Sequence, residues 1–301
     1  MKIAVTGATG FIGHYIVRQL LAAGHHLRCW RRDSSDLSGF PEDNNNLQWL
    51  TGELGDPAAT DQLVRDCDAV VHAALWRPGT HFRGGEGDIV QFAETNLLGS
   101  LRLIQAARSH HVPRFIFIST CAVHEIILED RPLDESHPLW PNSHYGAHKA
   151  AIEKFVHSYG LGEGYDICAL RPTGVYGLSR PPEQSKWYDL VHQVAHGETV
   201  QCQRGGKEVH AGDVARAVEL LLQADGIAGQ SYNCYDMYIS QWDVAHLAKE
   251  LSGSQAPITG KQTAPKNQIE NRKLCQLGMQ FGGPALLQQT IEEILQSIQG
   301  H

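Results

Sequence analysis

The chain has 301 residues, of which 42% are hydrophobic and 19% charged, and its formal net charge at pH 7 is −8. This length suffices for one large core with a smaller annex. The acidic balance argues against a nucleic-acid surface, and no apolar run approaches the ~18 residues of a membrane-spanning helix. An apolar strand begins almost at Met1, so we expect no signal peptide. Seven scattered cysteines without a CxxC pair predict reduced thiols in a cytoplasmic protein.

The first 170 residues alternate short apolar runs with longer amphipathic ones. We expect strands at 2–5, 27–30, 47–50, 69–72, 114–119 and 165–171, and helices at 11–23, 57–65, 89–111 and 144–159. Alternation at this spacing predicts right-handed crossovers and an α/β, Rossmann-type, doubly wound parallel sheet.

The pattern loosens after Arg171. We expect a loop at 178–186 and helices at about 187–196, 213–224, 240–251 and 285–298. The chain is therefore predicted to consist of a dinucleotide-binding domain over residues 1–172 and a smaller substrate-side lobe over residues 173–301. This lobe is expected to be partly interwoven with the sheet.

A glycine-rich run separates the first expected strand from the first helix. Gly7, Gly10 and Gly13 lie where the backbone of a dinucleotide-binding turn approaches the pyrophosphate, and the following helix N-terminus favours negative charge. The alternative is a plain tight turn.

The second expected strand ends at Arg31-Arg32. NAD-selective enzymes usually carry a carboxylate at this place for the ribose 2′-hydroxyl, whereas a guanidinium can pair with a 2′-phosphate. Arg31 therefore favours NADP over NAD, and a solvated basic strand end is the alternative.

Tyr145 and Lys149 are four residues apart and share one face of an expected helix. Making a tyrosine a base near pH 7 requires about 4 kcal/mol, and an exposed ion pair supplies only ~0.2–1 kcal/mol. Lys149 must therefore act in a partly closed cleft. Thr120, at the carboxyl end of a strand, could hold the substrate oxygen. The alternative for the pair is a solvated helix face.

Seventeen histidines include two i, i+4 pairs, His144/His148 and His192/His196. Neither pair has an evident third ligand, so we expect no metal site.

Several motifs occur in one order along most of the chain. They are the run 6–13, Val71-His72-Ala73-Ala74, Asn96, Ser119-Thr120, Tyr145…Lys149, the run 171–177 and the run 209–215. This order resembles the extended short-chain dehydrogenases/reductases, which include nucleoside-diphosphate-sugar epimerases and dehydratases and dihydroflavonol-type reductases.

The resemblance implies roles for individual residues. The catalytic set would be Thr120, Tyr145 and Lys149, with Asn96 near the proton network. The cofactor would contact Gly7, Gly10, Phe11, Ile12, Gly13, Arg31, Glu53, Leu54, Ala73, Tyr145, Lys149 and Pro172. A homodimer through the helices near 89–111 and 144–159 is also implied.

The departures from the family pattern concern the substrate. Cys121-Ala122 follow Thr120 where related 4,6-dehydratases have Asp-Glu, and Gly206 falls where many sugar-nucleotide enzymes have an arginine for the diphosphate. Gly174, His124 and His148 replace the family's usual Asn, Tyr and Ser. The substrate lining is expected from the segment 75–82 and the loop region 176–187, with Trp76, His124, Tyr176 and Arg204 as contacts.

The leading hypothesis is an NAD(P)-dependent oxidoreductase or epimerase that transfers hydride between a nicotinamide and a hydroxyl or carbonyl carbon. Its partner would be a small molecule, with a sugar nucleotide as one candidate, and neither nucleic acid nor membrane. The residues leave epimerase and reductase open. A non-catalytic dinucleotide-sensing regulatory protein is the alternative of a different class.

Overall fold

The computed structural model describes residues 1–41, 44–78 and 84–300, so part of the expected lining segment 75–82 lies outside the described residues. The described chain divides into two units, and each is considered by itself. The first unit contains Met1–Pro172, Val214–Cys234 and Glu270–Met279, and the second contains Thr173–Asp213, Tyr235–Ile269 and the residues from Gln280 onward.

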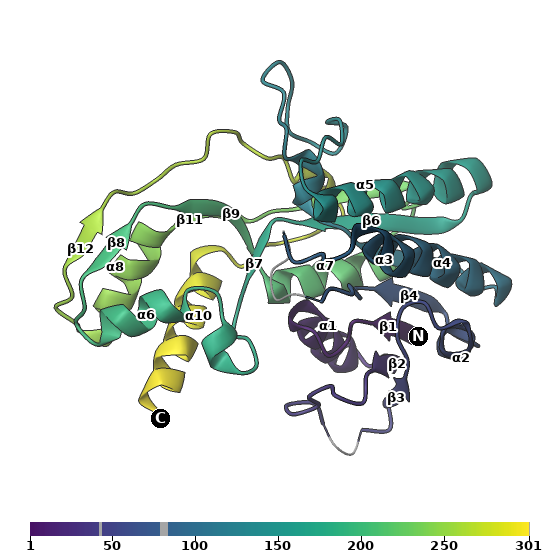
Figure 1. Cartoon of the computed structure of the whole chain (residues 1–301), viewed down its shortest axis with the longest axis horizontal. Coiled ribbons are helices and arrows are strands. Elements are labelled where there is room, and N and C mark those ends of the chain that lie inside the picture. The colour runs from purple at the N-terminus through teal and green to yellow at the C-terminus, as the bar shows by residue number, and fades with distance from the viewer. Residues whose placement is uncertain (42–43, 79–83, 301) are drawn as a thin grey trace. The chain divides into compact units, whose positions relative to one another are not determined.

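A seven-stranded parallel sheet forms the first unit (Figure 1). Its strands are β1 (Lys2–Thr6), β2 (His26–Arg31), β3 (Leu47–Thr51), β4 (Ala69–His72), β5 (Arg114–Ile118), β6 (Asp166–Pro172) and β10 (Gln230–Cys234). Their order is β10-β6-β5-β4-β1-β2-β3, so the direction of winding reverses between β1 and β4. The predicted doubly wound sheet is confirmed, and β10 extends it beyond the six strands expected from the sequence.

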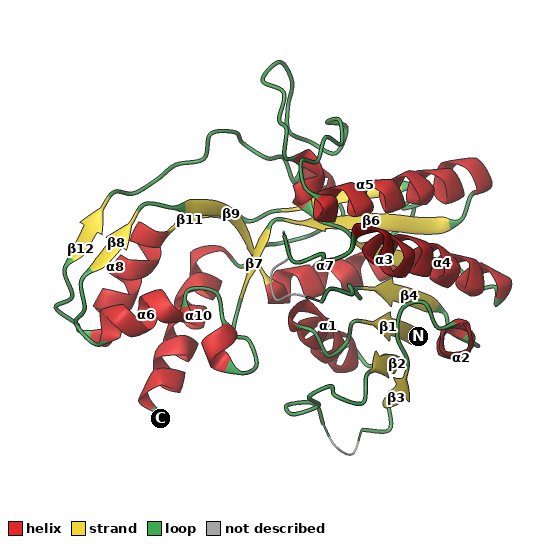
Figure 2. Cartoon of the chain, in the orientation of Figure 1, coloured by secondary structure: helices red, strands yellow, loops and turns green. Residues whose placement is uncertain are grey.

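Helices cover the sheet of the first unit (Figure 2). They are α1 (Phe11–Ala22), α2 (Pro57–Val64), α3 (Ile89–Ala93), α4 (Gly99–Ser109), α5 (His144–His157), most of α7 (Ala211–Gln223) and α9 (Arg272–Gln276). A π-helical stretch, Glu94–Leu98, joins α3 to α4, so the single helix expected over 89–111 has an irregular middle. Asp56 caps α2 by accepting hydrogen bonds from the backbone N–H groups of Ala58 and Ala59.

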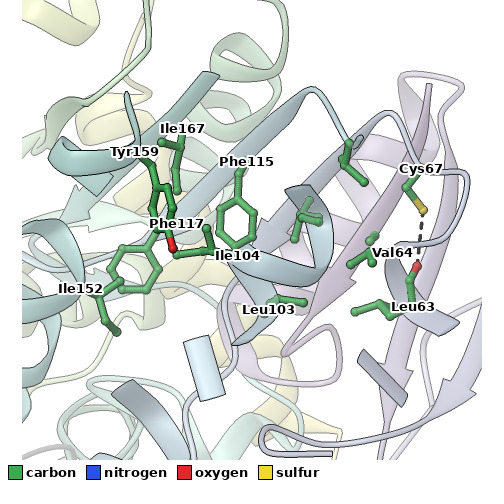
Figure 3. Packing of buried hydrophobic residues seen from close by; sticks show 14 of the residues in the cluster. Leu63, Val64, Cys67, Leu103, Ile104, Phe115, Phe117, Ile152, Tyr159 and Ile167 are labelled. Carbon is green, nitrogen blue, oxygen red and sulfur yellow. Dashed lines mark hydrogen bonds between the residues drawn. The ribbon is translucent and has the colours of Figure 1, made fainter. Parts of the chain in front are cut away.

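The core of the first unit follows from the two-residue period of its strands. Ala4, Phe115 and Phe117 pack in one cluster with residues of α2, α4 and α5 (Figure 3). Ile3 and Val5, which are equally buried, project to the opposite face. The helices α1 and α7 are joined by a hydrogen bond of 2.6 Å from Gln19 to Glu219. Each fully buried large side chain stabilises this layered arrangement by roughly 1.5–3 kcal/mol.

The second unit has two small sheets and three helices around its own core. One sheet contains β7 (Gly174–Tyr176), β9 (Gly205–His210) and β11 (Met237–Ser240), and the other contains β8 (Val200–Cys202) and β12 (Ile258–Gly260). The helices are α6 (Tyr188–Ala195), α8 (Gln241–Ser252) and α10 (Gly283–Gln299). A capping box between Ser240 and Asp243 begins α8. No helix among the residues described here is long and apolar enough to cross a membrane.

Candidate active site

The turn between β1 and α1 requires glycine at two positions. Gly7 has a φ of +70°, and a Cβ there would lie 2.6 Å from the carbonyl carbon of Ala73, just after β4. A Cβ at Gly13 would lie 1.9 Å from the Gly7 carbonyl oxygen, which accepts a hydrogen bond from Gly10 N at 3.0 Å. The first turn of α1, which starts with the half-buried Phe11 and Ile12, contains no acidic residue. These features fit a turn that receives an anionic pyrophosphate.

The end of β2 is joined to the glycine-rich turn. Ser35 Oγ accepts hydrogen bonds from Arg32 N at 2.9 Å and from Thr9 Oγ1 at 3.3 Å. The half-buried Arg31 makes no side-chain hydrogen bond to any residue in the described part of the chain. Glu53 is exposed. Leu54, by contrast, is 9% exposed and packs in the main core cluster, so its side chain contributes to the core.

A buried histidine connects β1, β4 and α4. His72 Nδ1 accepts a hydrogen bond from Thr6 Oγ1 at 2.7 Å, and His72 Nε2 donates to Ser100 Oγ at 2.8 Å. We assign this tautomer because Ser100 Oγ in turn donates to the Asn96 carbonyl oxygen at 2.5 Å. Burial lowers the pKa of His72 to about 3, so the ring is neutral in this network.

The side-chain amide of Asn96 hydrogen bonds to the segment that follows β4. Its Oδ1 accepts from Trp76 N at 2.7 Å, and its Nδ2 donates to Trp76 O at 2.9 Å and to Phe92 O at 3.0 Å. Asn96 therefore holds the backbone of half-buried Trp76 in place. The expected role of Asn96 near the proton network stays a prediction, and the sequence analysis did not single out Thr6 or Ser100. The motif at 71–74 contains His72, but no local pattern reveals its partners.

Helix α5 carries Tyr145 and Lys149 one turn apart. Lys149 is 4% exposed, and its Nζ donates to the Ile118 carbonyl oxygen at 2.7 Å and lies 4.6 Å from the centroid of the Phe117 ring. Burial lowers the pKa of Lys149 to about 7, and the Glu153 carboxylate acts in the opposite direction. The lysine is therefore enclosed, as the sequence argument required.

Thr120 lies two residues after the end of β5, on the segment that α5 approaches. A Cβ at Gly146 would lie 2.6 Å from the Ala122 carbonyl oxygen, so glycine permits this close approach beside Tyr145. Thr120 Oγ1 accepts a hydrogen bond from Ala122 N at 3.2 Å. Pro172 is buried at the end of β6, the strand next to β5. The structure thus places α5, which carries Tyr145 and Lys149, against the end of β5 and the segment of Thr120, and the expected cofactor contact Pro172 ends the neighbouring β6.

His124 was expected to contact substrate, but its surroundings argue against this. The residue is 4% exposed. Its Nε2 accepts from Arg171 Nη1 at 3.1 Å, and its Nδ1 donates to the Pro138 carbonyl oxygen at 3.2 Å. Burial and the Arg171 charge lower the pKa of His124 to about 4, which keeps it neutral. Both ring nitrogens are therefore used inside the protein, a fact that residue type alone could not indicate.

Two further expected substrate contacts lie in the second unit. Tyr176 is fully buried, with ring centroids 5.2 Å from Trp187 and 5.1 Å from His210, so its side chain belongs to that unit's core. Arg204 is exposed, and its backbone N–H and carbonyl oxygen are both hydrogen bonded to Gln241. In this conformation Arg204 is accessible to a ligand and Tyr176 is not.

The histidine pairs singled out in the sequence have different environments. His192 and His196 are stacked with ring centroids 4.1 Å apart. His148 is buried, with its ring centroid 4.9 Å from that of Phe92. Within residues 1–41, 44–78 and 84–300, no group of three or more His, Cys, Asp or Glu side chains could hold a metal ion.

Comparisons with known proteins define the class. The model of the NAD dependent epimerase/dehydratase family matches residues 3–234. A dTDP-glucose 4,6-dehydratase of Streptomyces niveus is 32% identical over 248 residues, which cover 77% of this chain and 72% of that protein. The low-salt glycan biosynthesis protein Agl12 of Haloferax volcanii is 30% identical over 245 residues, covering 77% and 76%.

Solved structures share the fold. The UDP-glucose 4-epimerase of Thermus thermophilus, in complex with NAD, superimposes with a TM-score of 0.79 at 24% identity and covers 98% of this chain and 99% of that one. The chain therefore belongs to the NAD dependent epimerase/dehydratase family. It is an NAD(P)-dependent enzyme of the extended short-chain dehydrogenase/reductase type, as the motif order indicated, and no comparison supports the non-catalytic alternative.

Proposed function

We propose that this enzyme catalyses reversible hydride transfer at an alcohol carbon of a sugar nucleotide, with Thr120, Tyr145 and Lys149 as its catalytic residues. The observation that carries this proposal is the enclosed Lys149 ammonium, one helical turn from Tyr145 and bonded to the β5 carbonyl two residues before Thr120. Family membership and the sugar-nucleotide enzymes among its relatives support the substrate class.

The roles follow from the chemistry of these side chains. Tyr145 accepts the proton of the substrate hydroxyl and returns it, while the Thr120 hydroxyl donates a hydrogen bond to the same oxygen. The Lys149 ammonium favours the phenolate form of Tyr145, because the attraction between opposite charges is stronger in a site that excludes water. A dinucleotide whose pyrophosphate is held at the glycine-rich turn would supply, through its nicotinamide, the hydride acceptor and donor. Asn96 contributes by holding Trp76.

The proposed reaction does not include the elimination of water that a 4,6-dehydratase catalyses. The two residues after Thr120 are Cys121 and Ala122, and neither is an acid. Cys121 Sγ donates to the Arg171 carbonyl oxygen at 3.0 Å, which places this thiol in the protein's own hydrogen bonding. Epimerisation or reduction therefore fits these residues better than a 4,6-dehydration.

The test is incubation of the purified protein with dTDP-glucose or UDP-glucose and each dinucleotide, followed by mass analysis of the sugar nucleotide. An isomer of unchanged mass that chromatography separates from the substrate indicates an epimerase. These sugars have no ketone to reduce, so loss of two hydrogens with reduction of NAD⁺ or NADP⁺ indicates a reductase running in reverse. Loss of water would contradict the proposal. Tyr145→Phe should lower turnover by roughly 10²–10⁴-fold while nucleotide binding persists.

Tyr165→Phe is the matched control for this variant. Its hydroxyl is buried without a hydrogen-bond partner among the described residues, so its removal should leave turnover unchanged. Undiminished turnover in Tyr145→Phe would overturn the mechanism.

We also propose a preference for NADP, a homodimer and a cytoplasmic location. Arg31 at the end of β2 supports the first. Exposed apolar side chains support the second. Leu98, the last residue of the π-helical stretch, is 42% exposed and lines a groove with Leu101, Arg102, Gln105 and Tyr159, and Phe155 on α5 is 40% exposed. The seven cysteines are free thiols, which supports the third. The assignment of dinucleotide binding to residues 1–172 and substrate binding to 173–301 stays a prediction.

A further inference from the structure

A buried ion pair lies on α5 and β6 beside the row formed by Tyr145 and Lys149. Glu153 is fully buried and Arg171 is 1% exposed. Arg171 donates to the Glu153 carboxylate from Nε at 3.0 Å and from Nη2 at 2.5 Å. Two charges in a protein interior cost free energy unless their partners are well arranged, and an apolar pair is often as stable. The chemistry proposed above gives this pair no role.

The Glu153 carboxylate collects donors from three neighbouring strands. It accepts hydrogen bonds from Ser119 Oγ at the end of β5, from Arg171 on β6, and from Ser231 Oγ on β10 at 3.2 Å. It lies one helical turn beyond Lys149, which binds the carbonyl oxygen of Ile118. Two successive turns of α5 thus bind two successive residues of the chain immediately before Thr120.

Arg171 extends the same arrangement to the segment after Thr120. Its Nη1 donates to His124 Nε2 at 3.1 Å and to the Glu135 carbonyl oxygen at 3.3 Å. Its own carbonyl oxygen accepts from Cys121 Sγ at 3.0 Å. The chain on both sides of Thr120 is therefore attached to one ion pair.

We propose that Glu153 and Arg171 are a positioning pair: the Glu153 carboxylate keeps the Lys149 ammonium charged beside Tyr145, and Arg171 holds that carboxylate in place. This inference rests on the function proposed above, because the charge of Lys149 matters through its effect on Tyr145. Neither residue of the pair needs to touch substrate or cofactor.

Among the described residues, the other groups that face Lys149 carry no negative charge near pH 7. The Phe117 ring and the Ile118 carbonyl face it from β5, and the charge of Lys149 itself helps to lower the pKa of His72 on β4 and of His148 on α5. Burial lowers the pKa of both histidines to about 3, so they are neutral near pH 7. Burial lowers the pKa of Lys149 to about 7, and the Glu153 carboxylate opposes this lowering. Without that carboxylate, Arg171 would be an unbalanced positive charge nearby.

The experiment measures the titration of Lys149 directly in the chain without added nucleotide. Lysine labelled with ¹³C at Cε gives one resonance per residue, and its loss in Lys149→Met assigns the signal. In Glu153→Gln the Lys149 midpoint should fall by on the order of one pH unit. In Glu153→Asp, which keeps the charge, the midpoint should stay close to that of the unaltered protein.

Two further variants separate electrostatics from folding. Glu153→Gln/Arg171→Met removes both charges, so the Lys149 midpoint should lie between those of the single variant and the unaltered protein; it serves as the test if Glu153→Gln does not fold. Glu163→Gln removes the carboxylate of a surface pair with Arg108 and should leave the midpoint unchanged.

An unchanged Lys149 midpoint in folded Glu153→Gln, or in the double variant, would overturn the inference even if turnover fell, because the loss would then reflect packing alone. Under the turnover assay, the alkaline loss of kcat should move to lower pH in Glu153→Gln. If Tyr145→Phe proved active while the Lys149 midpoint still shifted, the proposed function would fail and the electrostatic link would stand.

Discussion

Two regions at the carboxyl ends of the strands of the main sheet differ in how many hydrogen bonds their charged residues make. We call the region of α5, β5 and β6 the buried edge and the region at the ends of β2 and β3 the exposed edge. Around α5, β5 and β6, the charges of Lys149, Glu153 and Arg171 are buried and hydrogen bonded. Arg31 at the end of β2 is half-buried, and Glu53, which follows β3, is exposed. Buried charge costs free energy unless it is partnered, so substitutions at the first edge should affect stability and activity together. Substitutions of the charged residues at the exposed edge should change the selectivity between NADP and NAD and leave stability nearly unchanged.

Acid should destabilise the buried edge more than any single substitution. His72, His124 and His148 have a pKa of about 3, 4 and 3, below the ~6.5 of an unfolded chain. The unfolded state therefore binds more protons between about pH 4 and 6.5, so stability is full above this window and is lost as the pH falls through it. Three protons give a slope of up to about 4 kcal/mol per pH unit, measurable by urea unfolding at a series of pH values. His148→Phe should remove about one proton from this slope, and an unchanged slope would contradict this account.

Arg171→Met tests the same edge at one position. It leaves the Glu153 carboxylate buried without its cation, which should cost about 3–5 kcal/mol in urea unfolding. The matched control is Arg108→Met, because Arg108 pairs with Glu163 at the surface and its loss should cost no more than about 1 kcal/mol. Equal losses in the two variants would show that burial of the pair does not matter.

The sequence predicted those parts of the site that have a local signal. The glycine spacing at 7–13 and the Tyr145–Lys149 interval each follow from one turn or one helix, and the strands were placed within one or two residues. The partners Glu153 and Arg171 are 18 residues apart, and His72 and Ser100 are 28 apart, on elements that meet only in the folded sheet. No period or motif encodes such a pair. For the same reason His124 was expected to contact substrate, since the sequence shows a residue type but not its burial.

Ser100→Ala should have a smaller effect on the buried edge. The variant leaves His72 Nε2 without its acceptor, which should cost about 1–3 kcal/mol, while the Asn96 carbonyl oxygen keeps the hydrogen bond from Gly99 N–H. Ser38→Ala is the control near the other edge, because that hydroxyl binds the exposed Asp36 and its loss should fall within about 0.5 kcal/mol. Differential scanning calorimetry of both variants measures the contrast. A loss as small as the control's would mean that the His72 network is not a stabilising feature.

Arg31→Ala should have the smallest effect on stability and still a clear effect on function. The Arg31 guanidinium makes no side-chain hydrogen bond within the described residues, so unfolding should change by less than about 0.5 kcal/mol. Loss of a charge-assisted contact to a 2′-phosphate would weaken NADPH binding by roughly tenfold and leave NADH binding nearly unchanged. Isothermal titration with both dinucleotides measures the two affinities.

Arg28→Ala, on the same strand, is the control and gives the opposite expectation, because Arg28 Nη1 donates to the Gln62 and Arg65 carbonyl oxygens at 3.0 and 2.6 Å. That variant should lose stability and keep the ratio of affinities, and if Arg31→Ala keeps the ratio as well, selectivity for the 2′-phosphate does not come from the end of β2.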